Sequence, residues 1–190
     1  MFRWNETVRS HSSFFSYKAI YAIYRFRKLI SATILLRLYE AFVVPHFFYC
    51  STIWHFCDPR NRDKLETLKK HILRVILKDR VSSYNVLLEQ IGNFSLSKRH
   101  IQNMLIIIFK CIHNAQYPQY LRELFSLRPV DYLMRGTDIL TLPKTYTTTY
   151  GLNSFTYTAA KFWNALPYRL RAISCLNDFI RAIWQHELIG

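Results

Sequence analysis

The chain has 190 residues, enough for one globular domain with its own hydrophobic core. Hydrophobic residues make up 51% of it and aromatic residues 16%, which excludes a chain that is disordered throughout. Its 26 Lys and Arg against 12 Asp and Glu give a formal net charge of +14, and so basic a balance favours polyanionic partners, either nucleic acid or an acidic membrane surface.

Two helices are predicted in the first part of the chain. The first runs from about Phe14 to Lys28 and ends in a basic cluster that suits the negative end of a helix dipole: Arg25, Arg27 and Lys28. The second follows Ser31, a candidate N-cap, and repeats apolar residues at spacings of three and four.

A dense aromatic block follows from Pro45 to Trp54, with Phe47, Phe48 and Tyr49 inside it. Aromatic rings of this kind can stack on unpaired bases. Packing in a hydrophobic core is the favoured interpretation, because the block continues an apolar helix and contains no charged residue. A second block near the C-terminus is interpreted in the same way: Phe155, Tyr157, Phe162 and Trp163.

A basic amphipathic helix is predicted from Pro59 to Arg80, with Asp58 as its N-cap and proline in the first helical position. Three cations spaced by four share one stripe of this helix, and a fourth lies beside them: Lys70, Arg74 and Lys78, with Lys69 adjacent. Such a stripe can follow a row of phosphates. The alternative is a solvated face with local ion pairs. Residues 1–80 hold 15 Lys and Arg against 6 acidic residues, and this concentration favours the nucleic-acid interpretation.

Shorter helical signals follow the basic helix. Ser82 or Ser83 opens a short helix that Gly92 stops, Ser95 caps a longer one, and Pro118 opens a further turn. Because these helices lie close together in sequence, an antiparallel bundle with short loops is the economical arrangement.

Two more cations lie in the first turn after Ser95. Lys98 and Arg99 are mildly unfavourable at the positive end of a helix dipole, by about 0.3–1 kcal/mol each. A bound anion would relieve this conflict, and simple tolerance of a small cost explains the pair equally well.

The last third of the chain differs from the rest in amino-acid composition. From Arg128 to Tyr157, prolines, glycines and a Thr- and Tyr-rich run predict an irregular arm with room for one or two short strands. A final helix is predicted from Ser174 to Leu188. The expected fold is therefore all-α in the main, with a flexible N-terminus at 1–13, a helical bundle at 14–127, and an arm plus C-terminal helix at 128–190.

Several functional classes lack their motifs. No two acidic residues are adjacent, so the paired carboxylates of two-metal catalysis are not apparent, and no Walker, His-Glu-x-x-His or Gly-x-Ser-x-Gly motif occurs. The four cysteines have no zinc spacing. The apolar run from Leu29 to Phe56 is broken by charges and a proline, and the N-terminus has no signal peptide. We therefore expect no catalytic residues, metal, cofactor or membrane span, and an intracellular location, in the nucleus or the cytoplasm.

An ordered set of short motifs runs through nearly the whole chain, from roughly Tyr17 to Ile183. Its first half comprises Leu38-Tyr39, Pro45-His46, Tyr49-Cys50, Trp54, Lys64-Leu65, Arg74-Val75-Ile76, Ser83-Tyr84, Leu87-Leu88, Gly92, Leu96 and Arg99. Its second half comprises Leu142-Pro143, Tyr150-Gly151, Ser154-Phe155, Tyr157, Ala160, Trp163-Asn164, Leu166-Pro167 and Phe179. This set resembles the segment just downstream of the polymerase palm in LINE-type (non-long-terminal-repeat, jockey-like) retrotransposon reverse transcriptases, which are RNA-directed DNA polymerases of transposable elements.

The resemblance implies a thumb-like helical region with a C-terminal extension, which in those enzymes grips the template and primer duplex beside the palm. It implies no catalysis, because the palm aspartates of the family have no counterpart here. The initial Met1 favours an open reading frame left from a truncated element. The sequence therefore predicts a non-catalytic fragment that binds RNA, DNA or their hybrid without sequence preference. The alternatives are a helical remnant that docks a protein such as an upstream palm, and, less favoured, membrane association through Leu29 to Phe56.

Overall fold

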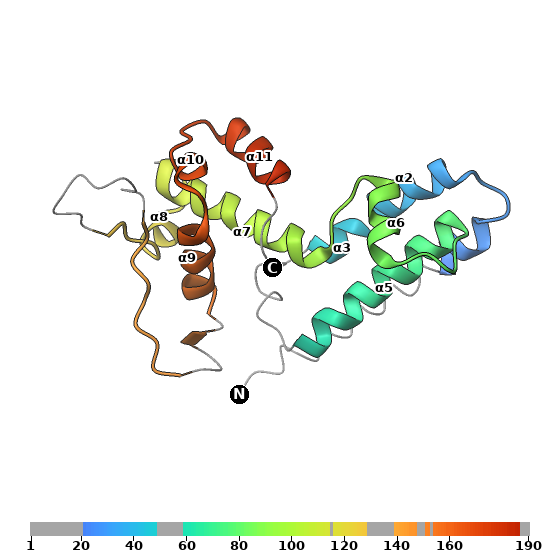
Figure 1. The fold of residues 1–190 in the computed structure, drawn as a ribbon, viewed down its shortest axis with the longest axis horizontal. Coiled ribbons are helices and arrows are strands. Elements are labelled where there is room, and N and C mark those ends of the chain that lie inside the picture. Colours follow the sequence, from blue (N-terminus) through green and yellow to red (C-terminus); the bar gives the residue numbers. More distant parts are fainter. Residues whose placement is uncertain are drawn as a thin grey trace. The chain divides into compact units, whose positions relative to one another are not determined.

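A computed structural model describes residues 21–48, 59–114, 116–128, 139–147, 151–152 and 154–186, and these residues are mainly α-helical, as the sequence predicts (Figure 1). Strand pairing within this part of the chain is limited to one antiparallel bridge between Leu127 and Leu140. The expected flexible segment at 1–13, the start of the first helix, and the rings of Tyr49 and Trp54 lie outside the described residues.

The chain divides into two compact units, residues 1–96 and residues 97–190. The change in sequence composition instead predicts a boundary after residue 127. The long helix α7 (Leu96–His113) packs with the C-terminal helices, since the rings of Phe109 and Phe179 stack with their centroids 4.4 Å apart. A boundary after residue 127 would therefore separate α7 from C-terminal helices with which it shares a core.

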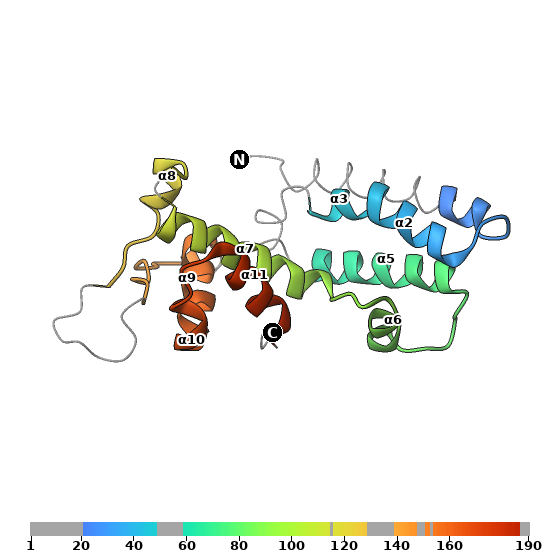
Figure 2. The same cartoon turned by 90° about the horizontal axis from the view of Figure 1, so that it is seen from above.

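The described residues of the first unit include α2 (Ala32–Phe42), α3 (Val44–Phe48), α5 (Pro59–Leu77) and α6 (Tyr84–Ile91), and residues 21–26 are also helical. Helices α2 and α5 lie side by side and run in opposite directions (Figures 1 and 2), and α5 also contacts α6. Their apolar faces form one core, whose most deeply buried side chains include Leu35, Tyr39, Phe47, Ile72, Ile76 and Leu87. Burial of Phe47 confirms a core role for this member of the aromatic block.

The loop and helix α6 after α5 are fixed by local backbone geometry. Helix α5 ends at Leu77, three residues before the predicted end, because Lys78 adopts the left-handed conformation with φ 56°. Gly92 ends α6 as predicted, and it caps the helix in the left-handed conformation with φ 64°. The Tyr84 hydroxyl donates a 2.5 Å hydrogen bond to the Glu66 carboxylate, which joins α6 to α5. Burial, together with this carboxylate, raises the pKa of Tyr84 above its ordinary value.

The second unit contains α7, α8 (Gln119–Arg122), α9 (Phe155–Ala165), α10 (Tyr168–Arg171) and α11 (Leu176–Gln185). Its centre is aromatic, since Phe109, Trp163 and Phe179 are at most 2% exposed. The Gln102 side chain, fully buried on α7, donates to the carbonyl of Ile183 on α11 at 3.3 Å. Burial of Trp163 confirms the core interpretation for that ring of the second aromatic block.

Two helices of the second unit were not predicted. Helix α9 begins after Ser154, whose hydroxyl accepts from the Tyr157 amide at 3.3 Å, and α10 follows Pro167. Within the described part of the predicted arm, strand pairing consists of the Leu127–Leu140 bridge, and the side chain of Asn164 bonds to the backbone of Leu140. The Asn164 amide accepts from Leu140 N at 2.8 Å and donates to Leu140 O at 2.9 Å.

Candidate nucleic-acid interface

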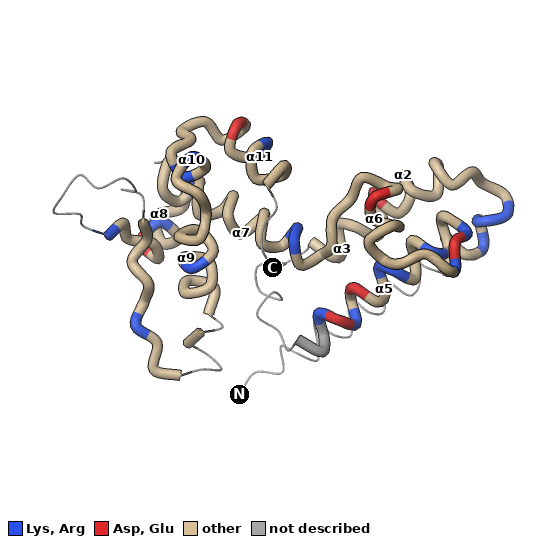
Figure 3. Tube along the Cα trace, in the orientation of Figure 1, with Lys and Arg blue, Asp and Glu red and all other residues tan. Residues whose placement is uncertain are grey.

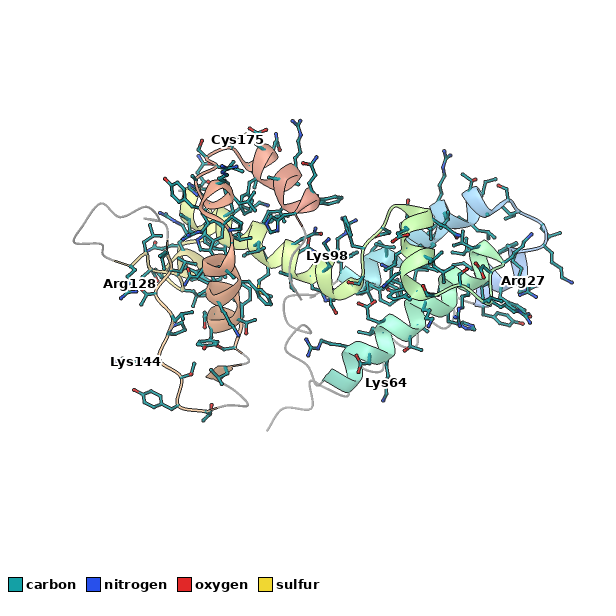
Figure 4. All side chains as sticks on the ribbon, in the orientation of Figure 1. Arg27, Lys64, Lys98, Arg128, Lys144 and Cys175 are labelled. Carbon is teal, nitrogen blue, oxygen red and sulfur yellow. The ribbon has the colours of Figure 1, made fainter. Side chains whose placement is uncertain are left out.

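A hollow of about 610 Å³ lies in the first unit, between the C-terminal part of α5 and residues 24–28. Eight residues line it: Tyr24, Arg27, Lys28, His71, Arg74, Val75, Lys78 and Arg80. Five of these eight are Lys or Arg and none is Asp or Glu. Figure 3 shows Lys and Arg at the turn after residue 24 and along α5, and Figure 4 shows Arg27 at one end of α5 and Lys64 at the other. We call this group of lining residues the basic hollow.

Helix α5 supplies three of the lining residues through its own periodicity, and Lys78 follows directly after its last residue. His71, Arg74 and Val75 lie three and four positions apart, so they share one stripe of the helix. Val75 is 8% exposed and belongs to the core, whereas Lys78 is exposed. The helix is therefore anchored by its apolar face while the adjoining stripe presents cations.

The segment before α2 supplies three further lining residues: Tyr24, Arg27 and Lys28. Residues 21–26 are helical, and the chain then turns, with the amides of Leu29 and Ile30 both bonded to the Phe26 carbonyl. The Arg27 guanidinium lies 3.9 Å from the centroid of the Tyr24 ring, and its Nη2 donates to the Tyr24 hydroxyl at 3.1 Å. Tyr24 thus orients the side chain of Arg27, one of the five cations of the basic hollow.

The loop after α5 is held by Asp79. Its carboxylate accepts from the amides of Val81 at 2.9 Å and Ser82 at 3.0 Å, and Arg74 Nη2 donates to the Ser82 carbonyl at 3.2 Å. Hydrogen bonding by the Ser82 side chain, then by the two amides, lowers the pKa of Asp79 below its ordinary value, with a smaller contribution from the charge of Arg74. Asp79 therefore places the loop that carries Lys78 and Arg80.

Substitutions of Asp79 should separate loop placement from net charge. Asp79→Asn and Asp79→Ala both raise the net charge by one, but only asparagine keeps a side-chain oxygen for the turn. If loop placement matters, Asp79→Ala binds nucleic acid several-fold more weakly than Asp79→Asn, as measured by fluorescence anisotropy. Equal or tighter binding by Asp79→Ala would contradict this role.

The same carboxylate predicts a pH dependence of stability. Because the folded state lowers the pKa of Asp79, its ionised form stabilises the fold above the ordinary value of 3.8, and that contribution is lost as the pH falls through the lowered pKa. The melting temperature of the wild type should therefore fall as the pH is lowered through this range. Asp79→Asn has no carboxylate to protonate here, so its melting temperature should lack the part of the fall that Asp79 causes.

Lys69 is a correction to the predicted stripe. Its side chain is only 3% exposed, and its ammonium donates to the carbonyl of Phe94, 25 residues further along the chain. Lys69 therefore ties α5 to the segment after α6 and does not face the solvent with Lys78.

We expect Lys69→Ala to lower the free energy of unfolding by about 1.5–3 kcal/mol, the usual contribution of a hydrogen bond to a charged group. Its effect on nucleic-acid affinity should be smaller than that of Lys78→Ala, which removes the same charge from an exposed position. Urea denaturation and anisotropy measure the two quantities. If Lys69→Ala lost more affinity than Lys78→Ala and kept its stability, Lys69 would be part of the nucleic-acid interface.

The remaining predicted cations lie outside the basic hollow. Arg25 is exposed and Lys70 is half-buried, and neither lines it. Lys98 and Arg99 belong to the second unit, where the Arg99 guanidinium lies 4.0 Å from the centroid of the Trp184 ring. This ring contact gives Arg99 a stabilising partner at the start of α7.

The sequence interpretation missed Tyr24, His71 and Arg80. His71 could have been found, because it precedes Arg74 by three positions and so shares its stripe. Tyr24 and Arg80 join the basic hollow only through the packing of residues 24–28 against α5, which helical periodicity does not reveal.

The described residues show neither a metal site nor a membrane span. Within the described residues, no group of three or more His, Cys, Asp or Glu side chains could hold a metal ion, and no helix in that part of the chain is long and apolar enough to cross a bilayer. Comparison with models of protein families, with curated proteins and with solved structures finds no match for this chain.

Proposed function

We propose that this chain binds RNA, DNA or RNA–DNA hybrid without sequence preference, through the phosphate backbone, and that it acts as a non-catalytic region like the thumb of LINE-type reverse transcriptases. The observation that supports the binding proposal is the basic hollow, in which five cationic side chains from three segments converge with no acidic residue in the lining. Each cation that neutralises a phosphate releases condensed counterions, and this release drives sequence-independent binding.

The enzyme class follows from the same proposal. The chain contains no adjacent acidic residues and shows no metal-binding group among its described residues, so we propose that it has no polymerase activity alone. An upstream polymerase palm is its proposed protein partner, and the nucleus or cytoplasm its proposed location.

A titration of the intact chain tests the binding proposal. Labelled 20-nucleotide RNA, DNA, duplex and hybrid are compared by fluorescence anisotropy at 50 and 200 mM NaCl. With at most five phosphate contacts on a single strand, log K should fall with a slope no steeper than about −3.5 against log salt, and affinity should drop by at most the order of 100-fold between the two conditions. Absence of binding at 50 mM, or binding that is insensitive to salt, would contradict the proposal.

A second candidate function is docking of a protein by the first unit. It is favoured by large apolar side chains that remain exposed on and before α2, including Leu29 at 80%, Phe42 at 64% and Ile34 at 49%. Exposed apolar groups of this size are a feature of protein interaction surfaces when they adjoin one another. Failure of the nucleic-acid titration, together with binding of a reverse transcriptase palm that Phe42→Ser abolishes, would establish this function in place of the first.

A further inference from the structure

The basic hollow combines its cations with one aromatic ring. Tyr24 belongs to the lining, its side chain is 47% exposed, and the Arg27 guanidinium covers one side of the ring at 3.9 Å from its centroid. Aromatic rings that are held in place and accessible are the platforms on which single-stranded nucleic acids stack their bases. The hollow thus offers two kinds of contact, one for phosphate and one for a base.

The size of the hollow limits what can enter it. A volume of about 610 Å³ lies within the range of about 300–1,000 Å³ that is typical of small-molecule pockets. A B-form duplex has a major groove about 12 Å wide, so the duplex as a whole is much larger than this space. One or two nucleotides of a single strand match the volume.

The charge of the hollow favours a terminal phosphate over an internal one. An internal phosphodiester carries one negative charge, whereas a phosphate monoester carries about −1.5 to −2 at neutral pH. Lys28, Lys78 and Arg80 form no ion pair with a carboxylate in the part of the chain that the structure describes. The nearby carboxylate of Asp79 is outside the lining and is bonded to Val81 and Ser82.

We propose that the basic hollow binds the phosphorylated end of a single nucleic-acid strand, with the terminal phosphate monoester among Lys28, Arg74, Lys78 and Arg80 and the terminal base stacked on Tyr24. This proposal rests on the proposed function and specifies the ligand of the same site. A 5′-phosphate and a 3′-phosphate present the same monoester chemistry, and the experiment distinguishes them.

The test uses the intact chain and labelled eight-nucleotide strands that differ only at their ends, with a 5′-phosphate, a 3′-phosphate or two hydroxyls, together with a blunt duplex of the same sequence. We expect one phosphorylated strand to bind on the order of tenfold more tightly than the unphosphorylated strand, and the tighter of the two identifies the end. Equal affinities for all three strands would overturn the proposal.

Two variants of Tyr24 test the stacking contact. Tyr24→Leu keeps an apolar side chain but removes the ring, and should weaken binding of the phosphorylated strand on the order of tenfold while changing duplex affinity less than twofold. Tyr24→Phe is the matched control, because it keeps the ring and removes only the hydroxyl that accepts from Arg27. Strand binding that is the same in wild type and Tyr24→Leu would overturn the stacking role.

Different results would contradict the proposed nucleic-acid binding and the preference for a terminal phosphate. If all strands and the duplex bind equally and with a steep dependence on salt, the proposed function stands and the terminal-phosphate proposal is wrong. If nothing binds at 50 mM NaCl, both are wrong.

Discussion

Replacement of Arg27, Lys78 and Arg80 by alanine together is expected to weaken binding of single-stranded nucleic acid on the order of 100-fold at 0.1 M salt. Each lost phosphate contact on a single strand removes about 0.7 from the slope of log K against log salt, so three contacts flatten it by about 2. Arg74 is left in place because it also bonds to the Ser82 carbonyl and so helps to hold the loop after α5.

A matched variant controls for net charge. Arg37, Lys64 and Lys161 are exposed and lie outside the basic hollow, and their replacement by alanine lowers the formal charge from +14 to +11, as the first triple variant does. Anisotropy titrations at several salt concentrations compare the two. If both variants lose affinity equally, the positive charge of the whole chain drives binding and the basic hollow has no special role.

Phe179→Ala is expected to lower the free energy of unfolding of the second unit by about 3–5 kcal/mol. The ring is fully buried and lies 4.4 Å from Phe109 and 5.7 Å from Trp163, centroid to centroid. Removal of a large core side chain loses its transfer free energy and leaves a cavity that neighbours fill only in part. The loss is a large fraction of the 5–15 kcal/mol that holds a typical domain together.

Urea denaturation followed by circular dichroism measures this change. Tyr168→Ala is the control, because it also removes a ring, but from a side chain that is 49% exposed. A loss below about 1.5 kcal/mol for Phe179→Ala would mean that the aromatic centre of the second unit is not packed as described.

The helices that were predicted correctly have strong local signals. Pro59 and Gly92 mark helix ends through backbone conformations that belong to those residue types, and the apolar stripes of α2 and α7 have the period of a helix. Helix α9 was missed because its Thr and Tyr content favours extended backbone. Burial of Ala159, Ala160 and Trp163 outweighs that weak preference.

Local sequence patterns predicted part of the candidate site. Spacing alone places Arg74 and Lys78 on one stripe, and the basic cluster before residue 29 was recognised as well. That Arg27 and Lys28 meet this stripe depends on how the chain folds back between residues 28 and 59. The burial of Lys69 was likewise beyond a local pattern, because its partner Phe94 is 25 residues away.

At position 78, backbone stability and phosphate binding favour different residues, because the backbone of Lys78 is left-handed. A residue with a Cβ atom in this conformation costs about 1–2 kcal/mol, a cost that glycine would avoid, yet glycine would remove a cation from the basic hollow. Lys78→Gly should therefore yield a more stable protein that binds phosphate less well. In a comparison of related sequences, lysine or arginine at this position would mark the chains that use the hollow, and glycine would mark the chains that favour stability.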